Sequence, residues 1–306
     1  MSQSPLPTAQ EHVLTLIAKP GSGHLTPQLA ETVEAAVGAK HLYWLADGEA
    51  ADIPLLDGAG EATIKARAAL AGAPIDVIVQ PAEGRRKQLL IADMDSTMIE
   101  QECIDELAAE IGVGERVAAI TARAMNGEIE FDAALRERVG LLKGLDISVI
   151  DKVLASRITL ASGGHVLLAT MKARGGHAAL VSGGFTHFTS RIGATLGFDE
   201  NRANILLEHD GKLTGQVSEP ILGADAKVVA LNEIAQKLAI MTDQAITVGD
   251  GANDLPMLLQ AGSGVALHAK PSVAAKARMV IDHGDLTALL YVQGYRKSDF
   301  TVPALN

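Results

Sequence analysis

The sequence predicts an α/β protein with a doubly wound parallel sheet, a helical cap insertion and a small α+β N-terminal domain. From residue 88 onward, short apolar runs alternate with helical patterns, as is typical of a doubly wound sheet. Residues 99–160 interrupt this alternation with helical patterns alone, and residues 1–84 show a different order of elements. We therefore expect a small domain over 1–84 and a larger domain over 85–306, with the cap at about 99–160.

The N-terminal domain is expected to follow the order β-α-β-β-α-β. Its strands are predicted at four apolar segments, residues 12–18, 42–45, 51–55 and 75–79. Thr26 is a candidate N-cap for the first helix, in which Leu29, Val33 and Val37 recur at helical spacing. A second helix is predicted over residues 61–70. This order indicates a split-βαβ module of the ferredoxin-like or ACT-like kind.

The larger domain is predicted from four apolar runs, residues 89–92, 178–181, 245–248 and 279–281. Helical patterns separate them at residues 166–174, 185–196, 226–238 and 255–260. Near-continuous apolar runs suit parallel strands that are covered on both faces. Because ligands of such sheets bind at the carboxyl ends of the strands, the polar clusters that follow three of these runs are candidate site residues.

Two segments depart from the alternation. Residues 104–111 and 131–142 carry apolar stripes at helical spacing, so the insertion is expected to be a helical cap over the end of the first strand. Residues 204–221 instead resemble a hairpin, with Asp210-Gly211 as its turn.

Composition argues against several classes of function. The chain has 306 residues, a net charge of −11 and 3% aromatic residues, which disfavours nucleic acid and anionic membranes as partners. No apolar run approaches the ~18 residues that cross a bilayer, and residues 1–11 lack the pattern of a signal peptide. A single cysteine, Cys103, excludes an internal disulfide and a multi-cysteine metal site. We expect a cytoplasmic protein.

Aspartates follow two of the predicted strands. Asp93 and Asp95 come directly after the first strand, where one carboxylate can act as a nucleophile while the other moves protons. Asp250 and Asp254 follow a later strand. Carboxylates without accompanying histidine or cysteine favour a hard cation such as Mg²⁺. Taken alone, an Asp-x-Asp pair is more often an acidic turn, here with Ser96 or Thr97 capping a helix.

Groups suited to a phosphate lie further along the chain. Ser182 and the amides around Gly183 can donate to phosphoryl oxygens, and Lys227 lies near the start of a later helix. Each also has a plainer interpretation, a tight turn for the first and a solvated surface side chain for the second. Electrostatics favours a joint role of these groups with the aspartates. A carboxylate about 4 Å from a phosphomonoester dianion meets a repulsion of roughly 8 kcal/mol at an effective dielectric of about 20. A divalent cation and a lysine would offset it.

Four motifs, in order, resemble those of haloacid dehalogenase-like phosphatases. They are Asp93-Met94-Asp95-Ser96-Thr97, Ser182-Gly183-Gly184, Lys227 and Gly249-Asp250-Gly251-Ala252-Asn253-Asp254. Within that superfamily, residues 102–106, 131–142 and 181–185 are similar to the phosphoserine phosphatases. The resemblance covers residues 89–290 or so and leaves the first eighty or so residues outside it.

The resemblance implies a Mg²⁺-dependent phosphomonoester hydrolase with a haloacid dehalogenase-like fold and a phosphoaspartyl intermediate. It assigns Asp93 as the nucleophile and Asp95 as the general acid and base. It places Mg²⁺ on Asp93, the backbone carbonyl of Asp95 and Asp250, with Asp254 supporting them. A substrate phosphate would be held by three residues, with Asn253 close to it: Ser182, Gly183 and Lys227.

In the cap, the resemblance implies contacts with the rest of the substrate. Glu102 would pair with the ammonium group of phosphoserine and Arg138 with its carboxylate, while Phe131 and Met125 line the pocket. Singly, Glu102 is also compatible with a first-turn acid favoured by the helix dipole, and Arg138 with a solvated surface arginine. Together, one residue of each charge suits a zwitterionic amino acid, and arginine matches a carboxylate with two donors.

The expected activity is hydrolysis of O-phospho-L-serine to L-serine and phosphate, the last step of serine biosynthesis. Two alternatives remain open: a related phosphatase or phosphotransferase for another small phosphomonoester, and a regulatory protein that binds without turnover. For the N-terminal domain, the sequence leaves open serine binding, formation of a homodimer, and stabilisation of the catalytic domain.

Overall fold

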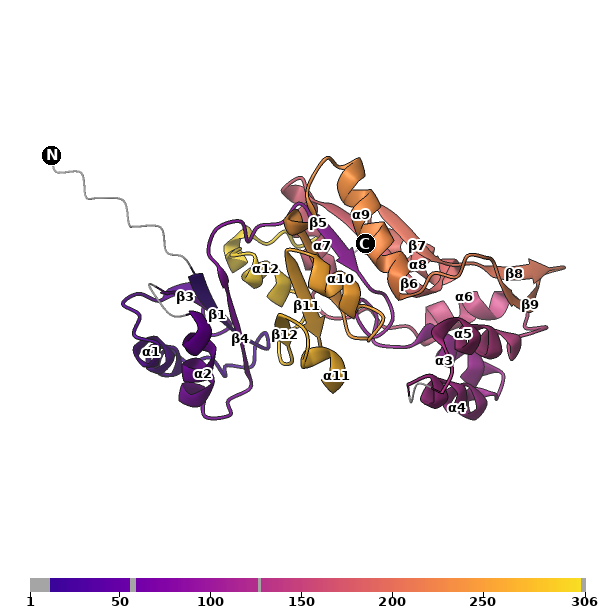
Figure 1. The fold of residues 1–306 in the computed structure, drawn as a ribbon, viewed down its shortest axis with the longest axis horizontal. Coiled ribbons are helices and arrows are strands. Elements are labelled where there is room, and N and C mark those ends of the chain that lie inside the picture. Colours follow the sequence, from indigo (N-terminus) through magenta and orange to yellow (C-terminus); the bar gives the residue numbers. More distant parts are fainter. Residues whose placement is uncertain (1–11, 56–58, 126–127, 304–306) are drawn as a thin grey trace.

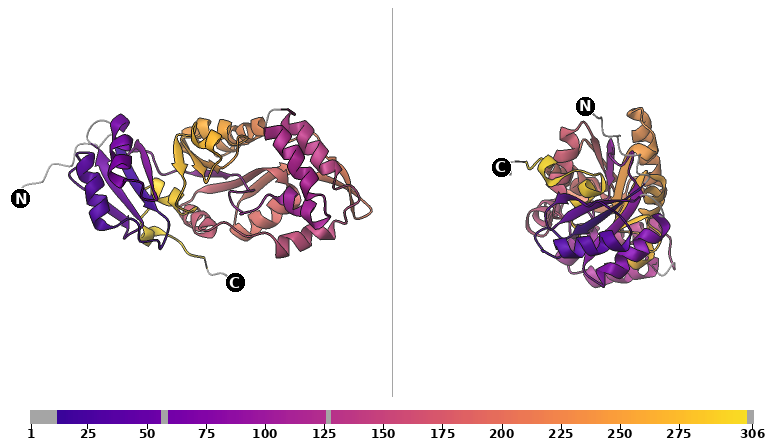
Figure 2. Two further views of the ribbon diagram at one scale, coloured as in Figure 1. Left: turned by 90° about the horizontal axis from the view of Figure 1, so that it is seen from below. Right: turned by 90° about the vertical axis from the view of Figure 1, so that its left-hand side faces the viewer.

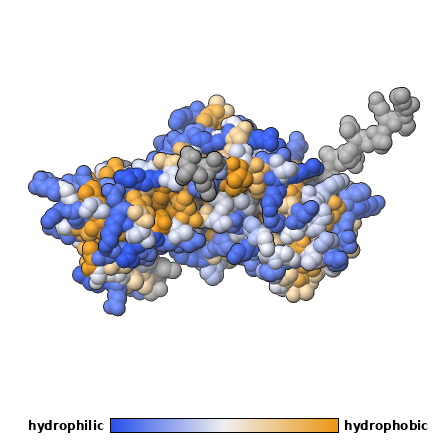
Figure 3. Space-filling view, turned by 180° about the vertical axis from the view of Figure 1, so that it is seen from behind, coloured by the Kyte–Doolittle hydropathy of each residue, from blue (hydrophilic) through white to orange (hydrophobic). Residues whose placement is uncertain are grey.

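The computed structural model describes residues 12–55, 59–125 and 128–303. Three parts follow one another along the long axis of the molecule: an N-terminal module, a domain built on a parallel sheet, and a helical cap (Figures 1 and 2). Within the described residues, no helix is both long enough and apolar enough to cross a membrane. Figure 3 shows hydrophilic side chains spread over all three parts of one face, with hydrophobic patches between them.

The N-terminal module has the predicted β-α-β-β-α-β order. Its elements are β1 (His12–Ala18), α1 (Pro27–Ala36), β2 (Tyr43–Ala46), β3 (Ala50–Leu55), α2 (Ala59–Leu70) and β4 (Ile75–Pro81). The strands form an antiparallel sheet in the order β2-β3-β1-β4, which is that of a ferredoxin-like module. Thr26 caps α1 as expected, because its Oγ1 accepts the N–H of Leu29 at 3.2 Å.

Both faces of this small sheet are buried. Leu14 and Leu16 of β1 pack beneath the two helices, as the alternation of a strand requires. Ile17 and Ile78 lie on the opposite face and belong to the same apolar core as the parallel-sheet domain. The module is therefore docked on the larger domain through a shared hydrophobic core.

Polar contacts fix this docking. The carboxylate of Asp76, in β4, accepts the backbone N–H groups of Asp282, His283 and Gly284 at 2.8–3.2 Å. Gln80 donates to the carbonyl of Val292 at 2.6 Å. Desolvation by burial raises the pKa of Asp76, and the amides that it accepts oppose this rise. The 282–284 loop is thus held by a residue of the N-terminal module.

The second domain carries a six-stranded parallel sheet in the order β12-β11-β10-β5-β6-β7. The strands are β5 (Leu89–Ala92), β6 (His177–Phe185), β7 (Glu200–Asn204), β10 (Ala245–Gly249), β11 (Ser263–Leu267) and β12 (Met279–Ile281). The doubly wound parallel sheet is confirmed. From β5 the chain first adds β6 and β7 on one side and later β10, β11 and β12 on the other. The order therefore reverses beside β5, where sheets of this kind bind ligands.

Helices cover both faces of this sheet. They are α7 (Gly164–Ala173), α8 (Thr186–Leu196), α9 (Ala224–Lys237), α10 (Leu255–Gln260), α11 (Pro271–Ala274) and α12 (Ala288–Val292). Short 3₁₀ turns lie at Thr242–Gln244 and Lys297–Asp299. In β5, Leu89 and Ile91 face the core shared with α9 and α10, and Leu90 and Ala92 face the opposite one. This two-sided burial explains why the strand is apolar throughout.

The insertion is helical, as predicted. It contains α3 (Cys103–Glu110), α4 (Gly114–Met125), α5 (Phe131–Gly140) and α6 (Ser148–Ser156), and an antiparallel bridge between Ile99 and Leu160 closes its base. The predicted hairpin is β8 (Leu206–His209) with β9 (Lys212–Val217). Its turn residues Asp210 and Gly211 have φ of 52° and 74°, which explains the residue types found there. Because β9 packs on α5, the hairpin forms part of the cap.

Replacing Asp76 by alanine should destabilise the protein, since three backbone N–H groups at the module interface would lose their acceptor. We expect the free energy of unfolding to fall by about 2–4 kcal/mol, measured from urea denaturation. Asp47→Ala, in an exposed turn of the same module, is the matched control and should change it by less than about 0.5 kcal/mol. Equal effects of the two substitutions would contradict this role for Asp76.

Candidate active site

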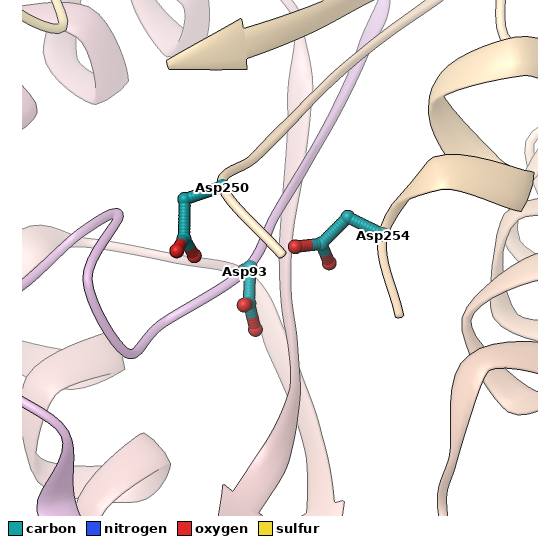
Figure 4. Close-up of side chains that lie close together, drawn as sticks. All are labelled: Asp93, Asp250 and Asp254. Carbon is teal, nitrogen blue, oxygen red and sulfur yellow. The ribbon is translucent and has the colours of Figure 1, made fainter. Parts of the chain in front are cut away.

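The candidate site lies at the carboxyl ends of the central strands. Asp93 follows β5, and its N–H donates to the carbonyl of Val248 at 3.0 Å, which ties it to the end of β10. Asp250 follows β10, and Asp254 directly precedes α10. Figure 4 shows these three carboxylates gathered at the strand ends, and one oxygen of each lies within 4.8 Å of the others. The clustering predicted from the sequence is therefore present.

Lys227 of α9 lies beneath this acidic cluster. Its Nζ is 2.7 Å from Asp93 Oδ1 and donates to Asp254 Oδ1 at 2.5 Å. The second oxygen of Asp254 accepts the N–H of Gly251 at 3.0 Å. Lys227 and Asp254 are both fully buried, so Lys227 is not the solvated surface lysine that the sequence also allowed. A Cβ at Gly249 would lie 2.3 Å from the carboxyl carbon of Asp254, so only glycine fits there.

The cluster fits a divalent cation. Three carboxylates and one ammonium group leave two negative charges, and every side-chain donor is an oxygen. Hard cations prefer such ligands. Burial raises the pKa of Asp250 to about 6, and the charge of Asp254 adds to this rise while Lys270 opposes it. Burial and the charge of Asp254 likewise raise the pKa of Asp93, against the attraction of Lys227. A bound cation would relieve this repulsion.

Asp95 contacts the start of α3, the first helix of the cap. Its Oδ1 accepts the N–H of Cys103 at 3.0 Å, and a Cβ at Gly184 would lie 2.7 Å from its Oδ2. Burial raises the pKa of Asp95 to about 7, and the charge of Glu102 adds to this rise while the contacts with Cys103 lower it. An acid in this range can both give and take a proton near neutral pH.

The pKa of Lys227 is set by two opposing effects. Although desolvation by itself lowers its pKa, the charges of Asp254 and Asp93 outweigh this and raise it. The lysine therefore stays cationic beside Asp93.

The Ser182–Gly184 segment lies within the last part of β6, where the pairing with β7 is irregular, and is not the tight turn that the sequence also allowed. The hydroxyl of Ser182 accepts the N–H of Gly184 at 2.9 Å. Asn204, at the end of β7, donates to the carbonyl of Gly183 at 2.9 Å, and its Oδ1 accepts the N–H of Leu222 at 2.7 Å. Asn204 thus joins this segment to the residues that lead into α9 and Lys227. The sequence analysis missed this residue because it assigned Asn204 to the start of the hairpin.

A cavity of about 750 Å³ lies between the strand ends and the cap. The structure brings nine of the proposed site residues to its walls: Asp93, Asp95, Glu102, Phe131, Arg138, Ser182, Gly183, Asp250 and Asn253. A Cβ at Gly183 would lie 3.3 Å from the ring of Phe131, so the cap closely covers this end of β6. Met125 ends α4, and its side chain lies outside the part of the chain that the structure describes.

Glu102 and Arg138 are each held by neighbours that the sequence analysis did not single out. Ser96 Oγ donates to Glu102 Oε1 at 2.8 Å. Arg138 donates from Nε to the carbonyl of Ala134 at 3.3 Å and from a terminal nitrogen to Thr121 Oγ1 at 3.4 Å. Desolvation lowers the pKa of Arg138, while the charges of Asp105 and Glu102 oppose this effect. Thr121 lies on α4 and Arg138 on α5, and the two helices pack together, so this support is a tertiary contact that no pattern within either helix predicts.

Curated phosphoserine phosphatases match about two thirds to three quarters of the chain. The chain is 43% identical over 220 residues to a phosphoserine phosphatase of Archaeoglobus fulgidus, a match that covers 71% of this chain and 64% of that protein. The match thus spans less than two thirds of the length of this relative.

Two solved structures extend over most of the chain. A haloacid dehalogenase family hydrolase from Salmonella enterica aligns with a TM-score of 0.82 at 32% identity, covering 92% of this chain and 98% of that one. A probable phosphoserine phosphatase from Vibrio cholerae aligns with a TM-score of 0.77 at 32% identity, covering 95% of this chain and 88% of that one.

The family profile of the haloacid dehalogenase-like hydrolases matches residues 90–259, which include Asp93, the Ser182–Gly184 segment, Lys227 and Asp250. These are the residues that the structure gathers at the strand ends. The chain belongs to the haloacid dehalogenase-like hydrolase family.

Proposed function

We propose that this protein is a phosphoserine phosphatase, which hydrolyses O-phospho-L-serine to L-serine and phosphate. One observation carries the proposal: Asp93 and Asp95 share a single cavity with Glu102 and Arg138. The cavity thus combines groups for phosphoryl transfer with one side chain of each charge for a zwitterion. The names of the Archaeoglobus and Vibrio relatives support this substrate.

In the proposed first step, a carboxylate oxygen of Asp93 attacks the phosphorus atom of the substrate. A bond forms between this oxygen and phosphorus, and the bond from phosphorus to the serine oxygen breaks. Asp95 gives its proton to the departing oxygen, which its raised pKa of about 7 permits. The products of this step are serine and a phosphoaspartyl group on Asp93.

In the second step, Asp95 takes a proton from a water molecule that attacks the same phosphorus atom. The bond from phosphorus to Asp93 breaks, which releases phosphate and restores the carboxylate. Asp95 is now protonated for the next cycle. Lys227, 2.7 Å from Asp93 Oδ1, keeps a positive charge next to the oxygen atoms on which negative charge accumulates.

The acidic cluster would hold Mg²⁺, with Asp93 and Asp250 as side-chain ligands and the carbonyl of Asp95 as a further one. When bound, such an ion neutralises phosphoryl charge and orients the phosphate for attack. In this assignment Asp254 supports the ion indirectly, because its two oxygens already accept hydrogen bonds from Lys227 and Gly251.

Recognition of the serine part is assigned to the cap. Glu102 would accept the ammonium group, and its hydrogen bond from Ser96 keeps the carboxylate in place. Arg138 would bind the substrate carboxylate, held by Thr121 and the carbonyl of Ala134. Phe131 covers the Ser182–Gly184 segment and would exclude water during attack.

The cytoplasm is the compartment that we propose for this enzyme. Its one cysteine, Cys103, is buried, and burial raises the pKa of the thiol further above its ordinary value. The fold therefore needs no oxidising environment. The N-terminal module is proposed to be a domain of its own over residues 1–84, with 85–306 forming the phosphatase domain and cap.

Asp93→Asn should abolish the release of phosphate from L-phosphoserine, because an amide oxygen is a poor nucleophile. We expect kcat to fall by about a thousandfold or more in a phosphate-release assay. Removal of divalent cations by chelation should have a similar effect on the wild-type enzyme, and added Mg²⁺ should restore the rate. Unchanged turnover after either treatment would refute the proposed mechanism.

Arg138→Ala should separate amino-acid recognition from phosphoryl transfer. The loss of a charged hydrogen-bonding partner should lower kcat/KM for L-phosphoserine by about 10- to 100-fold. Hydrolysis of 4-nitrophenyl phosphate, which has no carboxylate, should fall by less than about threefold. Arg136→Ala is the matched control, since Arg136 is exposed on the same helix and pairs with Glu219. An equal loss on both substrates would indicate a structural role for Arg138 instead.

A further inference from the structure

Asn204 holds two backbone segments that border the cavity between the strand ends and the cap. Its side chain is 3% exposed and lies at the end of β7. The amide nitrogen donates to the carbonyl of Gly183 at 2.9 Å and to that of Leu222 at 3.2 Å, and Oδ1 accepts the N–H of Leu222 at 2.7 Å. The amide therefore uses both of its donors and its acceptor, which fixes its orientation.

Neither segment is held by regular pairing at these positions. Strand β6 pairs with β7 at Val181 and again at Phe185, but the register shifts between the two, and Gly183 lies in the shifted stretch. Leu222 lies between β9 and α9, outside any helix or strand. The side chain of Asn204 takes the place of the missing main-chain pairing. It thereby fixes the distance between the end of β6 and the start of α9.

Phe131, the first residue of α5 in the cap, lies against both segments. A Cβ at Gly183 would lie 3.3 Å from Cζ of the ring, and a Cβ at Gly223 would lie 3.4 Å from its Cδ1. The two glycines thus face different edges of one ring, and the absence of a side chain at each lets the ring approach the backbone. The position of Phe131 therefore depends on the spacing of two segments that Asn204 ties together.

The same two segments carry groups of the site. Gly183 and Ala224 line the cavity, and α9, which begins at Ala224, carries Lys227. Asn204 lies behind this wall and is not part of the lining. Any effect of Asn204 on the reaction must therefore pass through the segments that it holds.

We propose that Asn204 is a positioning residue, which sets the spacing of Gly183 and Gly223 so that Phe131 rests on both when the cap covers the cavity. The inference rests on the proposed phosphatase function, in which water must be kept from the phosphorus atom until serine has left. Among side chains of this size, only asparagine offers two N–H donors and an acceptor on one group, and all three are used here.

A double-mutant cycle with Phe131 tests this role. Asn204→Ala should lower kcat for L-phosphoserine by about tenfold and change KM by less than about threefold, because the seat of the cap matters during attack. Asn204→Asp keeps the acceptor for Leu222 but lacks both donors, so it should lower kcat by as much. In the Phe131→Ala background, Asn204→Ala should lower kcat by less than about threefold, because the ring that needs the seat is already absent. Equal factors in the two backgrounds, or an unchanged kcat in Asn204→Ala, would overturn the proposal.

Asn201→Ala is the matched control. Asn201 lies on the same strand, and its Oδ1 accepts the hydroxyl proton of Thr189 at 2.8 Å, with neither residue in the lining of the cavity. This variant should keep kcat within about twofold of the wild-type value. A loss equal to that of Asn204→Ala would show that any weakened contact of β7 has the same effect, which would contradict a specific role for Asn204.

Two further measurements separate this inference from the assignment of the substrate. The same cycle with 4-nitrophenyl phosphate should give the same non-additivity, so an enzyme that hydrolyses this ester but not L-phosphoserine would refute the substrate while still deciding the role of Asn204. Hydrogen exchange requires no turnover. The N–H of Ala134, which donates to the carbonyl of Glu130 at 2.9 Å in the first turn of α5, should exchange several-fold faster in Asn204→Ala, and the N–H groups of β1 should not. Equal acceleration at both places would indicate general destabilisation and overturn the proposal.

Discussion

The buried ammonium group of Lys227 is the interaction on which the arrangement of the site depends. Asp93, Asp250 and Asp254 are buried at adjoining strand ends, where their charges repel one another. Lys227 contacts two of them directly and leaves a net charge that a divalent cation can neutralise. Replacing this lysine by a neutral side chain would leave three buried carboxylates without their cation, a change that is costly in proteins. The arrangement of the site and its local stability therefore rest on the same contact.

Much of the sheet and the motifs at its strand ends could be predicted from the sequence, and the reasons are local. Strands β5, β6 and β10 are apolar because both their faces are buried, and each ends in a polar cluster. Strand β7 was missed because it lies at the sheet edge with the polar sequence Glu-Asn-Arg-Ala-Asn. Strand β11 was missed because it begins Ser-Gly, residue types that are typical of turns. Asn204 and Ser96 escaped prediction since their importance comes from tertiary neighbours, which no spacing along the chain reveals.

The N-terminal module is integrated with the larger domain more closely than its separate fold suggests. Its sheet contributes Ile17 and Ile78 to the main core, and Asp76 holds the 282–284 loop. That loop continues into Asp285 and Leu286, and the carboxylate of Asp285 accepts the hydroxyl proton of Ser162 at 2.7 Å. A continuous series of contacts thus runs from the module to the returning connection of the cap. Contacts of this kind allow coupling, which measurements on variants must establish.

The β8–β9 hairpin restricts how the cap can move. Main-chain hydrogen bonds join it to the segment after α5, from Gly144 to Leu213 and from Leu213 to Leu145, each at 2.8 Å. The cap is therefore tethered to the sheet domain at two separate places, by the paired connections near Ile99 and Leu160 and by the hairpin that leaves β7. With two attachments, the cap can rotate about the line that joins them, but other rigid-body motions are restricted. Access to the cavity between the strand ends and the cap would then open along one rim.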